Sequence, residues 1–133
     1  MQLGLIGNGA HPETGEPVAY RLDDSLREAT EHGDASRLGD LMTVKEAIKP
    51  PHRVFRDSDG TYTLVAKPRK RYRDPATATQ APYYGIFLVH IDRGMTIFDF
   101  GWVDLSLEFP GLSVEEAERR FLSGTFGDEV KND

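Results

Sequence analysis

The sequence of 133 residues contains no cysteine. This absence excludes a disulfide framework, a zinc site built from thiolates and a cysteine nucleophile. Long apolar runs are also missing: the longest nearly apolar stretch is Tyr83 to Ile91, whereas a membrane-spanning helix needs about 20 residues. The first residues lack the basic start of a signal peptide. We therefore expect a small, soluble, cytoplasmic protein without membrane contact.

No cofactor-binding motif is complete. Gly7 and Gly9 follow an apolar pair, as in the fingerprint of dinucleotide-binding proteins. That fingerprint needs a third small residue, but Pro12 occupies its place, and the prolines disfavour the helix that must follow. We expect no cofactor, and we interpret residues 1–20 as a glycine- and proline-rich arm before a single domain of residues 21–133.

The four histidines are not spaced as a metal-binding pair. His90 and Asp92 share one face of an expected strand, but a metal site there needs a third ligand, such as Asp99 or Asp104. A histidine with an ordinary hydrogen bond near a strand end explains the same pattern. We therefore expect no metal.

Charge is distributed unevenly along the chain. The formal net charge is -6, which argues weakly against an obligate nucleic-acid binder. Residues 45–73 contain nine basic and three acidic residues, so this segment carries +6 and the remainder carries -12. The sequence thus has a cationic centre between acidic flanks.

The periodicity of apolar residues predicts an α+β domain. Short helices are expected from Asp24 to Gly33 and again up to Pro50, where two prolines end the helical pattern. Two β-hairpins are expected next, over residues 53–66 around an Asp-Gly turn and over residues 83–103. The residues between the hairpins predict a long exposed loop.

The C-terminal part predicts one more helix, because Ser113 and Glu116 have the spacing of a capping box. The expected fold is therefore α+β, with N-terminal short helices, a four-stranded antiparallel sheet built from two hairpins, and a C-terminal helix. In the second hairpin Phe98, Phe100 and Trp102 alternate onto one face, which we expect to face the core.

The stretch from Lys67 to Arg73 is the strongest local signal, because it places five cations around a tyrosine. Such a segment binds phosphates by charge and stacks a base on the aromatic ring. A solvated loop whose charge offsets the acidic flanks is the alternative interpretation. The candidate nucleic-acid-binding residues on both sides of the first hairpin are Lys49, Arg53, Arg56, Arg69, Lys70, Arg71, Tyr72 and Arg73.

Three residues are candidates for catalysis. Metal-independent RNA cleavage needs a base for the 2'-hydroxyl, an acid for the leaving oxygen and cations for the charge on phosphorus. His52 and His90 are candidates for base and acid, and Lys67, with the neighbouring arginines, for the cation. A carboxylate-pair hydrolase centred on Asp99 is a further alternative.

The stretch from Val44 to Arg56, the Asp-Gly hairpin, the Lys-Arg-Tyr sequence and two strands resemble a known layout. It is similar to the small toxin nucleases of the barnase, EndoU, colicin E5/D and RelE-like group, particularly the phage-type members. The resemblance covers roughly residues 38–105. It implies an antiparallel sheet whose concave face cuts RNA, with His52, Arg53, Lys67 and Tyr72 at the working positions.

Two functions follow as hypotheses. One is an RNA-directed, nuclease-like toxin or effector domain that uses a cationic rim, with RNA or another anionic ligand as its partner. The other is a non-enzymatic protein-binding module, such as an immunity protein, an inhibitor or a phage accessory factor. The aromatic hairpin is compatible with a dimer or with a monomer.

Overall fold

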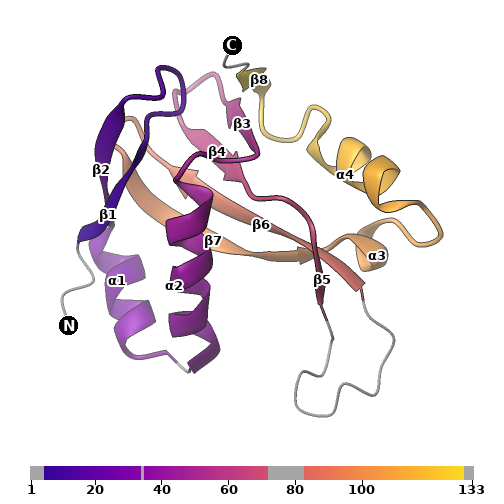
Figure 1. The fold of residues 1–133 in the computed structure, drawn as a ribbon, viewed down its shortest axis with the longest axis horizontal. Coiled ribbons are helices and arrows are strands. Elements are labelled where there is room, and N and C mark those ends of the chain that lie inside the picture. Colours follow the sequence, from indigo (N-terminus) through magenta and orange to yellow (C-terminus); the bar gives the residue numbers. More distant parts are fainter. Residues whose placement is uncertain (1–4, 34, 72–82, 131–133) are drawn as a thin grey trace.

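A computed structural model describes residues 5–33, 35–71 and 83–130. In these residues one mixed sheet carries helices on both faces (Figure 1). The elements in chain order are β1 (Leu5–Ala10), β2 (Pro17–Leu22), α1 (Asp24–Glu31), α2 (Ala35–Ala47), β3 (Arg53–Arg56), β4 (Tyr62–Val65), β5 (Arg69–Arg71), β6 (Tyr83–Ile91), β7 (Thr96–Asp104), α3 (Leu105–Glu108), α4 (Val114–Leu122) and β8 (Asp128–Val130).

The sheet corrects the expected four-stranded antiparallel arrangement, which is wrong. It has eight strands in the order β1-β2-β7-β6-β4-β3-β8, and β5 pairs with β6 beside this path. The pair β2/β7 is parallel, whereas the other pairs are antiparallel. The extra strands come from the two chain ends and from the basic segment, where turn residues and charge obscure strand periodicity.

The two central hairpins form where local sequence places them. In the first, Arg53 pairs with Val65 and Arg56 pairs with Tyr62 across a turn closed by Gly60, whose φ is 90°. Glycine takes this left-handed conformation without a steric penalty. The second hairpin joins β6 to β7. Together the hairpins supply the four adjacent strands at the centre of the sheet.

Residues 5–22 form a hairpin in the sheet, rather than the arm without regular structure that the glycines and prolines indicate. Gly9 is buried, and a β-carbon there would lie 2.7 Å from the β-carbon of Ile48, which directly follows α2. The backbone N–H of Ala10 donates to the Ile48 carbonyl at 2.7 Å. Glycine is therefore needed at position 9 for close approach between β1 and the α2 end.

Helix boundaries differ in part from the expected ones. Asp23, not Ser25, caps α1, because its carboxylate accepts from the backbone N–H of Leu26 at 2.7 Å. One continuous helix, α2, runs through most of the residues that precede Pro50. Ser113 caps α4 as expected and accepts from the Glu116 N–H at 3.2 Å.

Two apolar clusters lie on opposite faces of the sheet. The larger lies under α1 and α2 and includes Leu26, Val44, Phe87 and Ile97. The smaller lies under α3 and α4 and includes Ile86, Leu88, Leu105, Ala117 and Leu122. Alternation along β6 assigns Phe87 to one cluster and Ile86 and Leu88 to the other. Both faces of the central strand are therefore buried.

A register irregularity in β7 changes the face that Phe98 occupies. His90 pairs with Asp99 and Ile91 pairs with Ile97, so Phe98 is an extra residue between them. Phe98 is consequently 42% exposed, whereas Ile97 is fully buried. The expectation that Phe98 faces the core with Phe100 is wrong, because a bulge interrupts strand alternation.

Part of the expected loop between the hairpins is strand. Residues 69–71 form β5 and pair with residues 83–85 of β6, and residues 72–82 lie outside the described part of the chain. Among the helices that the structure describes, none is long and apolar enough to cross a membrane.

Candidate functional site

One open pocket of about 300 Å³ brings two of the predicted catalytic residues together. His52 and Lys67 line it, with Tyr84 and Glu118 on the other walls. Four different stretches of chain meet here, namely the start of β3, the end of β4, the start of β6 and the helix α4. The pocket thus lies at one edge of the central hairpins.

Backbone pairing holds the two catalytic candidates in place. The N–H of His52 donates to the carbonyl of Val65 at 2.9 Å, which extends the β3/β4 ladder by one residue. The N–H of Ala66 donates to the carbonyl of Phe87 at 3.1 Å, so Lys67 follows directly after a fixed backbone. These bonds fix the backbone beside His52 and Lys67, which lie just outside the ends of β3 and β4.

Glu118 is the residue that most distinguishes this pocket. It is 8% exposed, and its Oε1 lies 3.6 Å from Nε2 of His52 and 3.2 Å from Nε of Arg53. Both Arg53 Nε and Glu118 Oε1 are buried and lack well-aligned hydrogen bonds within the described residues. A buried carboxylate is costly unless cations compensate it. Glu118 is therefore held by charge between a histidine and an arginine.

Arg53 connects this pair to the C-terminal strand. Its NH1 lies 3.6 Å from Glu129 in β8, while its Nε faces Glu118. The register between β3 and β8 places Glu129 opposite Phe55, two residues from Arg53. The Arg53 side chain thus lies between two carboxylates, which compensate its charge.

His90, the other histidine predicted for catalysis, is not among the residues that line this pocket. Its Nδ1 lies 3.1 Å from the Thr63 hydroxyl, and its ring packs against Phe98 and Phe126. Burial lowers the pKa of His90 below its usual value, and Asp99 partly opposes that effect. The structure therefore gives His90 an ordinary hydrogen bond within an aromatic cluster.

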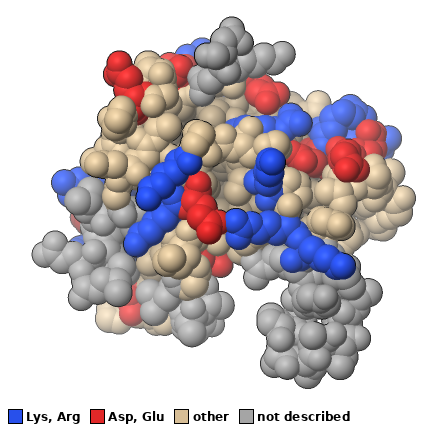
Figure 2. Space-filling model, viewed as in Figure 1, with Lys and Arg blue, Asp and Glu red and all other residues tan. Residues whose placement is uncertain are grey.

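Most of the described arginines in the cationic segment bind carboxylates of the same chain. Arg56 pairs with Glu13 in the turn between β1 and β2, and Arg69 pairs with Glu46 in α2. Figure 2 shows the basic side chains as a band that runs from α2 toward β5, with carboxylates within it. The expected cationic rim is thus partly neutralised, by Glu13 from an acidic flank and by Glu46 from the cationic segment itself.

Lysines of the same segment keep exposed charge. Lys49 and Lys70 are exposed, and neither forms an ion pair with another described residue. Lys70 pairs with Tyr84 across β5 and β6, which places the two on one sheet face. Arg71 ends β5, and the candidates Tyr72 and Arg73 lie outside the described residues.

Sequence reasoning missed Glu118 and Tyr84. Glu118 lies four residues after Val114 and next to Ala117, on the apolar face of α4. A glutamate on the apolar face of a helix could have identified Glu118, since glutamate side chains are rarely buried unless they are paired. Tyr84 could be recognised as a site residue only with the knowledge that β5 pairs with β6, because that pairing places it opposite Lys70.

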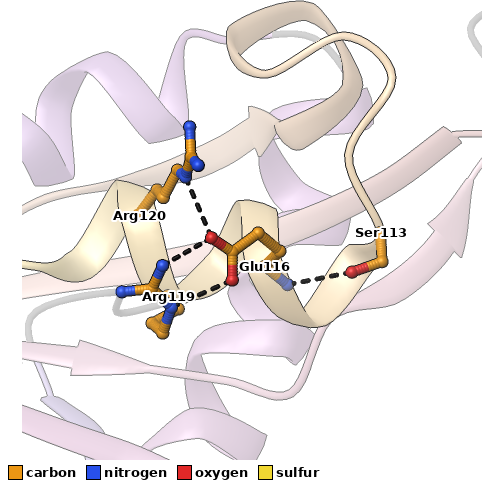
Figure 3. A network of polar contacts seen from close by, with 4 residues as sticks. All are labelled: Ser113, Glu116, Arg119 and Arg120. Carbon is orange, nitrogen blue, oxygen red and sulfur yellow. Dashed lines mark hydrogen bonds and ion pairs between the residues drawn. The ribbon is translucent and has the colours of Figure 1, made fainter.

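The outer face of α4 carries a separate charge network (Figure 3). Glu116 accepts from Nε of Arg119 at 3.0 Å and from Nε of Arg120 at 2.9 Å. The hydrogen bond from Arg119, followed by that from Arg120, lowers the pKa of Glu116 to about 2. This exposed network explains why Glu116 does not reach back to close the expected capping box.

Within residues 5–33, 35–71 and 83–130, no group of three or more histidine, aspartate or glutamate side chains is placed to hold a metal ion. Asp99 Oδ1 accepts from the neighbouring Phe100 N–H at 2.9 Å. No known protein family, curated protein or solved structure matches this chain.

Proposed function

We propose that the protein is a metal-independent, RNA-directed nuclease-like effector whose active site is the pocket of His52, Lys67, Tyr84 and Glu118. The observation that carries the proposal is the buried Glu118 carboxylate 3.6 Å from Nε2 of His52, in the pocket that Lys67 also lines. A histidine oriented by a carboxylate beside a cation is a common arrangement for general acid–base chemistry.

His52 is the general base in this proposal. Its Nε2 faces Glu118, so the neutral ring accepts a proton at Nδ1. When His52 takes the proton of the 2'-hydroxyl, the 2'-oxygen attacks phosphorus and a cyclic 2',3'-phosphate forms. Glu118 orients the ring and stabilises the imidazolium that results.

Lys67 is the general acid and the cation for the developing charge. Its ammonium forms no ion pair with a described residue, so it is available to a phosphate oxygen. As the bond from phosphorus to the 5'-oxygen breaks, Lys67 gives that oxygen a proton. His52 then releases its proton to solvent and Lys67 takes one from solvent, so both residues return to their starting states.

Tyr84 and Lys70 extend the site toward the substrate. Tyr84 is 43% exposed and lies opposite Lys70 on the same sheet face. An exposed ring beside an ammonium supports base stacking together with a phosphate contact. RNA bound here follows β5, toward the basic band of Figure 2.

The test is cleavage of a fluorescent RNA in EDTA by the wild type and by His52→Ala and Lys67→Ala variants. Loss of one acid–base partner costs about 100-fold or more in rate. His32→Ala and Lys45→Ala are the matched controls, since both residues are exposed and lie outside the pocket. Intact RNA with the wild type, or equal rates for His52→Ala and the controls, contradicts the proposal.

The internal pairing of Arg53, Arg56 and Arg69 favours a second candidate, a non-enzymatic protein-binding module. Leu107 in α3 is 70% exposed, and Leu112 in the following loop is 37% exposed. The test captures a protein partner with the wild type and measures whether the Leu107→Asp variant still retains that partner. Retention by Leu107→Asp excludes this surface, and Met42→Asp, at a position 64% exposed on α2, is the control.

A further inference from the structure

A second and larger cavity lies among the tips of the hairpins. Its volume is about 630 Å³, which is within the range of small-molecule sites. His11 from the β1/β2 turn, Gly60 from the β3/β4 turn and Arg93 from the β6/β7 turn all line it. None of the residues that line the His52 pocket lines this cavity. It is therefore a separate site.

The cavity walls depend on unusual backbone geometry. Met95 lines the cavity with a φ of 61°, and it is the one residue other than glycine with a positive φ among those described. Gly60 and Gly127, with φ of 90° and 93°, also line it. A β-carbon at Gly127 would lie 2.9 Å from the Arg56 carbonyl carbon. Such strain persists only where the surrounding structure requires it.

Hydrogen-bond donors come from two of the turns. Arg93 donates through Nε to the Asp59 carbonyl at 2.7 Å, which fixes the side chain and leaves its two terminal amino groups for the cavity. Nδ1 of His11 accepts from the Glu13 N–H at 3.1 Å, so Nε2 carries the proton of the neutral ring. An anionic group in the cavity thus meets pre-oriented donors.

Carboxylates line the β3/β8 side of the same cavity. Asp128 lies opposite Arg56 in the β3/β8 register, and Asp57 follows β3 directly. Asp57 uses Oδ1 to accept from the Ser58 N–H at 2.6 Å, which leaves Oδ2 for another donor. The lining therefore contains two arginines and two aspartates, and Arg56 is also paired with Glu13.

We propose that this cavity binds a small zwitterion of the amino-acid class. The carboxylate lies at Arg93 and His11, and the ammonium lies at Asp57 and Asp128. The apolar part contacts Tyr62 and Met95, which are 8% and 9% exposed at the cavity wall. A simple anion meets the aspartates and a simple amine meets Arg93, so neither satisfies both sides of the cavity.

The test is a titration with L-phenylalanine, L-leucine, L-arginine and L-glutamate at millimolar concentration, followed by the backbone amide signals of the protein. At least one of them shifts the signals of Gly60, Met95 and Gly127. Arg93→Ala weakens that binding by about tenfold or more, because a charge-assisted pair is lost. Arg27→Ala, which removes an exposed arginine of α1, leaves it unchanged.

Two analogues decide the ligand class. For a bound L-phenylalanine, the matched compounds are 3-phenylpropionate, which lacks the amine, and phenethylamine, which lacks the carboxylate; analogous pairs serve the other amino acids. Each binds about tenfold more weakly than the amino acid. Equal binding of either analogue, or no shift with any of the four amino acids, overturns the proposal.

Discussion

Tyr20 links alkaline pH to the stability of the fold. The side chain is fully buried, and its hydroxyl donates to the Ala10 carbonyl at 2.6 Å. Burial, with Tyr62 nearby, raises the pKa of Tyr20 from 10.0 to about 12. The hydrogen bond joins β2 to the end of β1, directly before His11. Tyr20 therefore anchors the turn that forms one wall of the larger cavity.

The magnitude follows from the shift in the pKa of Tyr20. A phenol with a raised pKa in the folded state stabilises the fold below pH 10.0, and this contribution is lost as the pH rises toward 12. A shift of two units corresponds to about 3 kcal/mol in all, and about half of it is lost by roughly pH 11. Tyr20→Phe cannot ionise, but it loses one hydrogen bond, which costs about 1 kcal/mol.

The order of stability of the wild type and Tyr20→Phe should therefore reverse as the pH rises. Below pH 10.0 the wild type is more stable than Tyr20→Phe, and above roughly pH 11 the variant is more stable. Other tyrosines and lysines titrate in both proteins, so their effects cancel in the difference. Urea unfolding at several pH values between 8 and about 11.5 measures the difference. A difference that stays constant over this range refutes the reasoning about Tyr20.

Three further predictions concern other residues. Gly127→Ala should destabilise the protein by about 2 kcal/mol or more in thermal unfolding, because its φ is 93° and the added carbon meets Arg56; an unchanged melting temperature contradicts this. Glu116 should titrate near pH 2 by NMR, and high salt should raise its pKa; a value near 4.5 at low salt rules out the arginine network. His90 should titrate below pH 6.5, so its contribution to stability is present above 6.5 and is lost as the pH falls; His90→Gln should remove that part of the acid dependence.

Features with short-range causes were predictable from the sequence. The turn at Asp57 to Gly60 and the cap at Ser113 each depend on a few neighbouring residues. Both central hairpins and the helix α4 therefore form where the sequence indicates them. The pairing of His52 and Lys67 in one pocket follows from the first hairpin, since the two residues flank it.

Features that depend on distant parts of the chain were not predictable. Gly9 belonged to the glycine- and proline-rich arm expected from the sequence, but it lies in β1, where it packs against Ile48. The bulge at Phe98 is set by pairing with β6, which alternation along one strand does not reveal. The arginines suggested an anion-binding rim, yet Arg56 and Arg69 meet carboxylates far away in the sequence. Charge counts along a chain do not show such pairing.

The most direct test of the proposed active site compares two oligonucleotides in EDTA, one all-ribose RNA and one with a single 2'-deoxy nucleotide at the cleavage position. The proposed mechanism requires the 2'-hydroxyl as nucleophile, with His52 as its base. The wild type should cut the RNA to a product ending in a cyclic 2',3'-phosphate and leave the substituted position intact. Two intact oligonucleotides, or cleavage of both to linear phosphate ends, contradict the account.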